Sequence, residues 1–268
     1  MTPTTNNHTP GPPADFHKRF DEDGYFVYED MYSPAEVAQK RDYIDLVVKN
    51  TNQWPSRMFN YSGEDSDSND DDVPTEIQAG HLHDWTFIDW VRDERILQVV
   101  RPLLGENIAV YNTSVFMKPP RSPVVIPWHQ DEVYYAVTTE FLVACWVALT
   151  DVTIDNGALK YLKVGHRCGV LPIGPPRDAN SAATFDREVM DIDPIRIVDV
   201  PMRAGSAIFH HSLLPHCSGP NNTDSPRWAL ALDYMRADYQ FTGPGEARRK
   251  WQRADFPLVS RDTVEASS

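Results

Sequence analysis

From residue 108 onward, the hydrophobic positions fall in short runs separated by Pro, Gly and Asn, a pattern typical of β-strands joined by turns. Helical segments do not alternate with strands in this part of the chain, which disfavours a doubly wound sheet. We therefore predict a mainly β fold of the sandwich or jelly-roll class. The predicted strands cover residues 108–118, 124–130, 141–150, 158–163, 194–200, 205–211 and 227–236.

Before residue 108 the pattern is mostly helical. A short helix near the start is followed by a strand-like GYFVYE and a longer helix. Ser33, Pro34 and Glu36 stand at the N-cap, first and third positions of this longer helix. A second helical stretch is predicted over residues 85–105, ending at a glycine. We expect these N-terminal helices to pack on the outside of the β-structure.

The chain has 268 residues, which suits one large domain with its own core. We expect residues 1–14 to form a disordered arm and residues 15–268 to form the single domain. Residues 62–76 include seven acidic residues, half of the formal net charge of −14. Like charges at this density repel one another, so this segment is predicted to be a solvated, mobile loop without a calcium site.

Net acidity disfavours nucleic acid and anionic membranes as partners. No apolar run is long enough to span a bilayer, and the first residues do not resemble a signal peptide. We expect a cytoplasmic monomer or homodimer that acts on a small molecule. Cys145, Cys168 and Cys217 lie far apart, which argues against a disulfide framework or a cysteine-rich zinc site.

A candidate metal site begins with His129 and Asp131. On an extended chain, residues two apart project to the same side, so an imidazole and a carboxylate can converge. Two histidines and one carboxylate form the facial triad of non-haem Fe(II) oxygenases. His216 is the candidate third ligand, and Arg227 follows it eleven residues later. The His-x-Asp pair alone is a weak signal, because such a pair more often belongs to a solvent-facing turn.

Longer motifs extend this pattern: GYFVYEDMYSPAEV, MKPP, WHQDEVYY, the block at residues 145–166 and the block at residues 204–235. In this order they resemble the phytanoyl-CoA dioxygenase family of Fe(II)- and 2-oxoglutarate-dependent oxygenases. The resemblance extends over most of the chain, from about residue 15 to residue 235. It implies a double-stranded β-helix that uses Fe(II), 2-oxoglutarate and O2.

Position by position, the resemblance makes His129, Asp131 and His216 the iron ligands. It makes Arg227 the residue that binds the far carboxylate of 2-oxoglutarate, a role that suits a planar bidentate guanidinium. The remaining cosubstrate residues that it implies are Ser218, Asn112 and Trp146, although Trp146 could equally be a plain core residue.

Two departures from the family pattern bear on these assignments. The usual Pro-Gly-Ser-His turn is replaced by residues 163–166, KVGH, and an upstream lysine that reaches the cosubstrate in some members is not evident. Asp131 is retained, whereas halogenating relatives have a small residue there. We therefore expect oxygen transfer, namely hydroxylation of an unactivated C–H bond of a small molecule. Desaturation, epoxidation and ring rearrangement remain alternatives, as does a non-catalytic cupin-like binding protein.

Substrate contacts are predicted from residues near the iron motif and from one upstream His-x-His pair. His210 and His211 are instead expected to be core histidines. A cationic or amine-bearing substrate is compatible with the acidity of the chain. The candidate substrate contacts are Glu132, Tyr134, Tyr135, His81 and His83.

Overall fold

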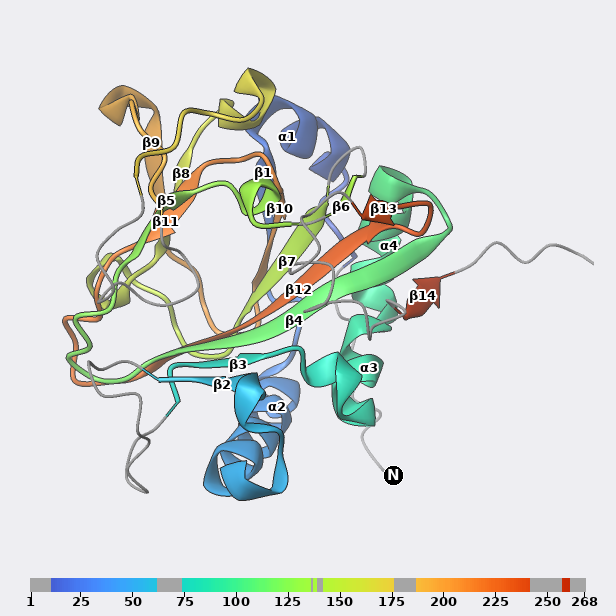
Figure 1. Cartoon of the computed structure of the whole chain (residues 1–268), viewed down its shortest axis with the longest axis vertical. Helices are drawn as coiled ribbons and strands as arrows, with labels where there is room; N and C mark the ends of the chain where they lie inside the picture. Colours follow the sequence, from blue (N-terminus) through green and yellow to red (C-terminus); the bar gives the residue numbers. More distant parts are fainter. Residues whose placement is uncertain are drawn as a thin grey trace, which may run out of the picture.

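Two antiparallel β-sheets form the jelly roll, and a computed structural model describes them over residues 11–61, 74–135, 137–138, 142–175, 187–241 and 257–260 (Figure 1). In spatial order, the larger sheet consists of β1 (Tyr25–Tyr28), β10 (Ala207–His211), β7 (Val143–Ala148), β12 (Arg227–Arg236), β4 (Ile108–Lys118), β3 (Glu76–Gln78) and β2 (Phe59–Asn60), with β14 (Leu258–Ser260) also pairing with β4. The smaller sheet consists of β5 (Ile126–His129), β11 (His216–Ser218), β8 (Leu159–Leu162) and β9 (Ile197–Val200). A separate pair consists of β6 (Val137–Thr138) and β13 (Gln240–Phe241). This architecture is the predicted double-stranded β-helix.

The N-terminal helices are α1 (Phe16–Asp23), α2 (Pro34–Lys49), α3 (Trp85–Val91) and α4 (Glu94–Leu104). Helix α1 contacts β1 and β10, and α4 contacts β7 and β12, so these helices cover the larger sheet as expected (Figure 1). The predicted start of α2 is confirmed, because Ser33 and Glu36 form a reciprocal capping box.

One predicted helix is in fact two. The stretch over residues 85–105 breaks after Val91, because the Asp93 side chain accepts a hydrogen bond from the Arg95 backbone N–H and caps a new helix. This capping satisfies a backbone donor that a continuous helix would bond internally. The prediction of one continuous helix was therefore wrong, although its end before Gly105 was correct.

Strand alternation divides the larger sheet into two faces. On β7, Val143, Cys145 and Val147 belong to the core that includes residues of the helices, whereas Trp146 and Ala148 belong to the core between the sheets. Strand β12 alternates in the same way, with its apolar Leu residues facing the helices. Its other face, which includes Arg227 and Asp233, therefore points into the jelly roll.

All seven predicted strands are present, but several are shorter than expected. Residues 194–196 form a 3-10 turn before β9, because Asp193 caps the turn and Pro194 begins it. The acidic loop was predicted to extend to residue 76, but Glu76 lies in β3 and is only 6% exposed. The predicted end of the loop was therefore too late. Residues 62–73 of that loop and residues 1–10 of the predicted arm lie outside the described residues.

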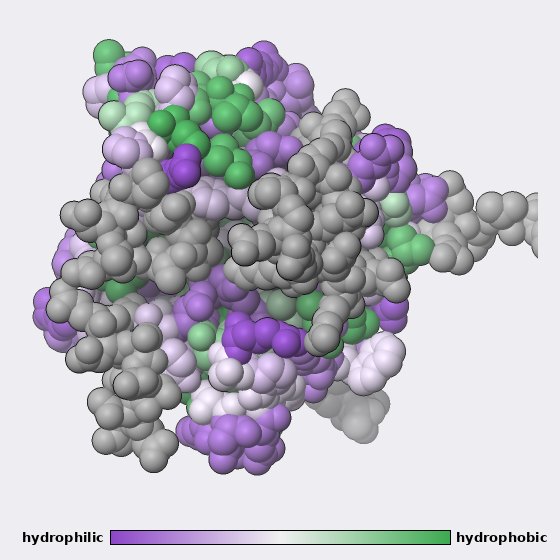
Figure 2. Space-filling model, viewed as in Figure 1, coloured by the Kyte–Doolittle hydropathy of each residue, from purple (hydrophilic) through white to green (hydrophobic). Residues whose placement is uncertain are grey.

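The described part of the surface is mostly hydrophilic in the view of Figure 2, with apolar residues gathered toward the top of that face. Among the helices of the described ranges, none has the length and apolar character needed to cross a membrane.

Gly205, just before β10, has a φ of +91° and accepts a backbone hydrogen bond from Tyr32 at 2.9 Å. A Cβ at this position would overlap the carbonyl oxygen of Tyr32. Gly105 has nearly the same φ, +90°, but a Cβ added there would have no described neighbour within 4 Å. The two glycines thus differ mainly in the space around them.

We expect Gly205→Ala to lower the free energy of unfolding by about 3–4 kcal/mol, because it combines backbone strain with a steric overlap. Gly105→Ala, which adds only the strain, should cost about 1–2 kcal/mol. Urea denaturation of the two variants measures both values. Equal losses would contradict the proposed role of the contact with Tyr32.

Candidate metal and cosubstrate site

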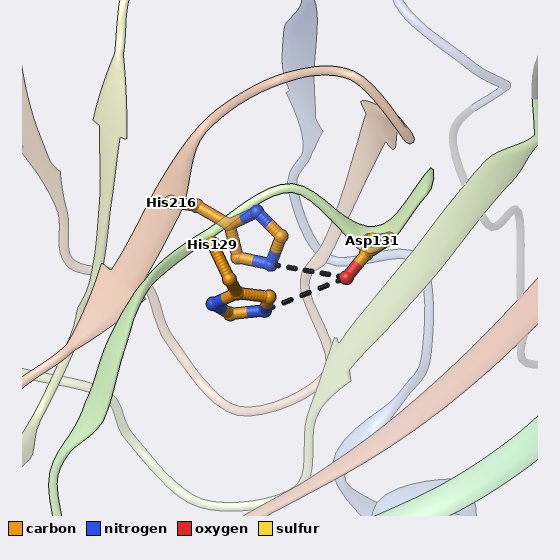
Figure 3. Close-up of side chains that lie close together, drawn as sticks. All are labelled: His129, Asp131 and His216. Carbon is orange, nitrogen blue, oxygen red and sulfur yellow. Dashed lines mark ion pairs between the residues drawn. The ribbon is translucent and has the colours of Figure 1, made fainter. Parts of the chain in front are cut away.

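Three potential metal ligands converge between the two sheets. His129 at the end of β5 lies directly across from His216 at the start of β11, with their ring centroids 4.1 Å apart. Asp131 follows two residues after His129, and one of its carboxylate oxygens lies 3.5 Å from Nε2 of His129 and 3.7 Å from Nε2 of His216 (Figure 3). The three donor atoms lie within 4.8 Å of one another, so they could hold one metal ion.

Backbone contacts fix the orientation of both imidazole rings. Nδ1 of His129 lies 2.8 Å from the carbonyl oxygen of Pro127, and Nδ1 of His216 lies 2.9 Å from that of Leu214. If each Nδ1–H donates to its carbonyl, both Nε2 atoms remain unprotonated acceptors facing Asp131. Burial, with repulsion from His129, lowers the pKa of His216 to about 3, which keeps this ring neutral and able to bind a metal.

Gln130 lies between His129 and Asp131 in the chain. Its side chain points to the opposite side from theirs and is fully buried. Its Nε2 donates to the carbonyl oxygens of Gly169 at 2.8 Å and Leu213 at 2.6 Å, and its Oε1 accepts from the N–H of Leu171 at 2.8 Å. Because neighbouring residues of an extended segment face opposite sides, these three hydrogen bonds hold the flanking ligands toward the interior.

His210, on β10, also takes part in the site. Its Nε2 lies 3.1 Å from the second oxygen of Asp131, and its Nδ1 lies 2.9 Å from the hydroxyl of Tyr161. His210 is buried, as expected, but sequence reasoning missed its contact with the ligand carboxylate. Burial opposes ionisation of Asp131, but the imidazoles around it, His216 first and then His129 and His210, hold the pKa of this carboxyl well below its usual range.

A second cluster lies around Arg227, which is only 2% exposed. Among the described residues, its Nε has no hydrogen-bond partner and its guanidinium forms no ion pair with a carboxylate. Burial lowers the pKa of Arg227 to about 10. Its guanidinium carbon lies 5.5 Å from the centroid of the Trp146 ring. A buried guanidinium without a counter-ion is costly, so this position suits an anionic ligand.

Lys118 is the residue directly across from Arg227 on β4, and sequence reasoning overlooked it. Its Nζ donates to the hydroxyl of Ser218 at 2.7 Å and contacts the carbonyl oxygen of Gly219. Burial, reinforced by repulsion from Arg227, lowers the pKa of Lys118 to about 6. A lysine at the last position of a predicted strand, within the MKPP motif, was the available signal. An anion bound here would interact with two basic side chains.

These groups share a cavity of about 410 Å³ between the sheets. Its wall includes nine of the residues predicted from the sequence: His129, Asp131, His216, Arg227, Ser218, Asn112, Trp146, Tyr134 and Tyr135. It does not include His81, His83 or Glu132. His81 instead contacts Thr113, and Glu132 accepts a hydrogen bond from Ser212 at 2.7 Å.

Asn112 differs from the other predicted cosubstrate residues. It lies opposite Asp233 on β12, six positions along β4 from Lys118. Its Nδ2 donates to Ser114 at 3.0 Å, while its buried Oδ1 has no partner among the described residues. This orientation offers a hydrogen-bond acceptor, so a contact with a carboxylate would require the amide to turn over.

The family profile described as phytanoyl-CoA dioxygenase matches residues 20–229 of this chain. The fold and the metal cluster define an Fe(II)/2-oxoglutarate oxygenase, and the chain belongs to the phytanoyl-CoA dioxygenase family. It is a 2-oxoglutarate-dependent dioxygenase, with Fe(II) and 2-oxoglutarate as its cofactor and cosubstrate.

Similar proteins of this group differ in their chemistry. A probable alpha-ketoglutarate-dependent hypophosphite dioxygenase of Stutzerimonas stutzeri is 26% identical over 84% of this chain and 79% of its own length. The structure of the non-heme monooxygenase ThoJ is 27% identical, with a TM-score of 0.73 over 92% of this chain and 84% of that one. The epimerase SnoN of nogalamycin biosynthesis shares the fold, with a TM-score of 0.70 and 22% identity over 92% of this chain and 97% of that one.

The hydrogen bonds of Gln130 lead to a prediction about both metal affinity and stability. Gln130→Met keeps the volume but leaves two carbonyls and one N–H unpaired, so we expect a loss of about 2–4 kcal/mol in the free energy of unfolding. Iron affinity should fall on the order of 10-fold, because the flanking ligands lose their fixed orientation.

The matched control is Gln98→Met, at an exposed position of α4. It should change neither quantity. Urea denaturation and iron titration of both variants provide the measurements, and wild-type iron affinity in Gln130→Met would disprove the orienting role.

Proposed function

We propose that this enzyme hydroxylates an unactivated C–H bond of a small organic molecule. In this proposal His129, Asp131 and His216 hold Fe(II), and Arg227 binds the far carboxylate of 2-oxoglutarate. The observation that carries it is that one cavity contains both a complete three-ligand cluster and a buried guanidinium that no described carboxylate neutralises.

The donor set fits iron. The two imidazoles and one carboxylate would hold Fe(II) and would leave room on the ion for oxygen and a chelating cosubstrate. When bound, Fe(II) with 2-oxoglutarate and oxygen supplies the oxidising power that removes hydrogen from a C–H bond. Asp131 occupies the position that a halide ion would need, which favours hydroxylation over halogenation. His210 holds the second oxygen of Asp131 and so acts as a positioning residue.

The basic cluster fits the cosubstrate. Arg227 offers a planar fork for a carboxylate, and Lys118 adds a second positive charge when it is protonated. Lys118 also orients Ser218, whose hydroxyl faces the same cavity. Trp146 forms the adjoining wall beside the guanidinium. The chain thus binds and orients the cosubstrate, and its apolar surroundings limit competing water.

The reaction is tested by incubating the iron-loaded enzyme with candidate small molecules and following succinate release and oxygen uptake together. Hydroxylation adds the mass of one oxygen atom to the product. Product mass separates this outcome from desaturation and oxidative ring rearrangement, which remove two hydrogens, and NMR of the product separates it from epoxidation, which adds the same mass. A complete absence of 2-oxoglutarate turnover in the iron-loaded enzyme would contradict the proposed function.

Removing one ligand should remove the metal. We expect His216→Ala to lower iron affinity more than about 100-fold, since losing even a partner of a metal ligand costs 10–100-fold. His211→Gln is the control, because His211 lies on β10 but is not part of the cavity wall. Iron content after dialysis measures the effect, and full occupancy in His216→Ala would exclude His216 as a ligand.

Arg227 should control cosubstrate affinity rather than iron content. Loss of a bidentate contact in a closed pocket costs roughly 2–5 kcal/mol, so Arg227→Gln should weaken 2-oxoglutarate binding about 30- to several-thousand-fold. Arg227→Lys keeps the charge but loses the fork, and its affinity should fall between the wild type and Arg227→Gln.

The surface variant Arg121→Gln serves as the control, because the Arg121 side chain is 62% exposed and forms its ion pair with Asp224, also on the surface. It should bind 2-oxoglutarate as the wild type does. If Arg227→Gln binds the cosubstrate with unchanged affinity, the carboxylate is held elsewhere.

A further inference from the structure

Asp233 lies at the opposite end of the cavity from Arg227. Both residues are on β12 and face the same cavity, but they are six positions apart. At about 3.3 Å per residue, their backbones are separated by roughly 20 Å. Their partners on β4 are Lys118 for Arg227 and Asn112 for Asp233. The cavity therefore has a basic end and an acidic end.

The carboxyl group of Asp233 is enclosed without a cation. The residue is 8% exposed, and no Lys, Arg or His side chain in the described ranges forms an ion pair with it. Its side chain shares a hydrogen bond with Tyr135. Burial, with repulsion from Asp131, raises the pKa of Asp233 well above its usual range. A carboxyl group held in this way gains a strong partner if a ligand brings a positive charge.

The charges in a site that holds Fe(II) and 2-oxoglutarate also favour a cationic substrate. The two charges of Fe(II) offset those of 2-oxoglutarate, and Lys118 and Arg227 together add at most two positive charges. The described part of the wall contains three carboxyl groups, those of Asp131, Asp233 and Glu76, and Glu76 accepts a hydrogen bond from Asn60 at 2.8 Å. When bound 2-oxoglutarate favours the charged form of Lys118 and a bound cation favours that of Asp233, all of these described groups are ionised and one negative charge is left over. A substrate with one positive charge would neutralise it.

The surroundings of Asp233 suit an organic cation. Four tyrosines line the described part of the cavity, and the rings of Tyr111 and Tyr135 lie 4.4 Å apart at an angle of 54°. The faces of aromatic rings attract ammonium groups. Asn112, across from Asp233, adds a buried Oδ1 acceptor that no described donor reaches. An ammonium group donates hydrogen bonds but accepts none, so it complements both Asp233 and Asn112.

We propose that Asp233 is a specificity-determining residue that binds an ammonium group of the substrate, together with Asn112 and the tyrosines near it. This inference rests on the proposed function, because it assigns the acidic end of the cavity to the substrate and the basic end to 2-oxoglutarate. It names an amine-bearing small molecule as the substrate class. The amine would lie on the side of the metal that is away from Arg227. A carbon of the same molecule would then face the iron.

Three probes of similar size test the proposal: cyclohexylamine, which is cationic at neutral pH, cyclohexanol, which is neutral, and cyclohexanecarboxylate, which is anionic. Their dissociation constants are measured by NMR line broadening with Mn(II)- and 2-oxoglutarate-loaded protein, in which the paramagnetic ion reports binding near the metal. We expect cyclohexylamine to bind the wild type at least 10-fold more tightly than cyclohexanol, and the carboxylate to bind most weakly.

Asp233→Asn removes the charge and nearly preserves the shape. It should weaken cyclohexylamine binding about 10- to 100-fold and change cyclohexanol binding less than about twofold. Asp199→Asn is the control, because Asp199 is an exposed carboxylate of β9 that pairs with Lys160. It should behave as the wild type.

A wild type that binds cyclohexanol as tightly as cyclohexylamine overturns the inference, whether or not the variant folds. Retention of the cation preference in Asp233→Asn also overturns it. The 2-oxoglutarate affinity and the slow succinate release without substrate are measured in parallel on the iron-loaded enzyme. If both are normal while the cation preference is absent, the proposed function stands and only the substrate assignment fails.

Discussion

The pairing of β11 with β5 is the constraint on which the site depends. It sets His216 directly across from His129, and β8 fixes the other side of β11 by pairing His216 with Tyr161. A slip of one residue would turn His216 out of the cavity, because side chains alternate between the faces of a strand. The metal cluster is thus a consequence of strand register, and the three short strands around it have little freedom to adjust.

Much of this arrangement is encoded locally and was predictable. The strand limits of β4 and β12 match the predicted 108–118 and 227–236, because both strands are long and bounded by clear turn residues. The alternation of β12 correctly placed Arg227 and Asp233 on one face. The His-x-Asp spacing also predicted that His129 and Asp131 converge, since the chain stays extended through Gln130 after β5 ends, and His216 lies beside them as the family resemblance implied.

What sequence reasoning missed depends on contacts between distant segments. Strand β11 has only three residues, too few for a hydrophobic period, so the strand that carries His216 was not predicted. His210 and Lys118 acquire their roles from residues 79 and 100 positions away in the chain. For His81 and His83, by contrast, the His-x-His spacing suggested substrate contacts. The His81 ring instead contacts Thr113, and neither histidine lines the cavity.

If 2-oxoglutarate binds at Lys118 and Arg227 as proposed, these adjacent residues also couple the stability of the fold to cosubstrate binding. Two basic groups buried side by side disfavour the folded state until an anion joins them. 2-Oxoglutarate would then act as a folding ligand as well as a reactant, contributing about 2.7 kcal/mol when its concentration is 100 times its dissociation constant. With little 2-oxoglutarate bound, the enzyme would be less stable and more easily unfolded.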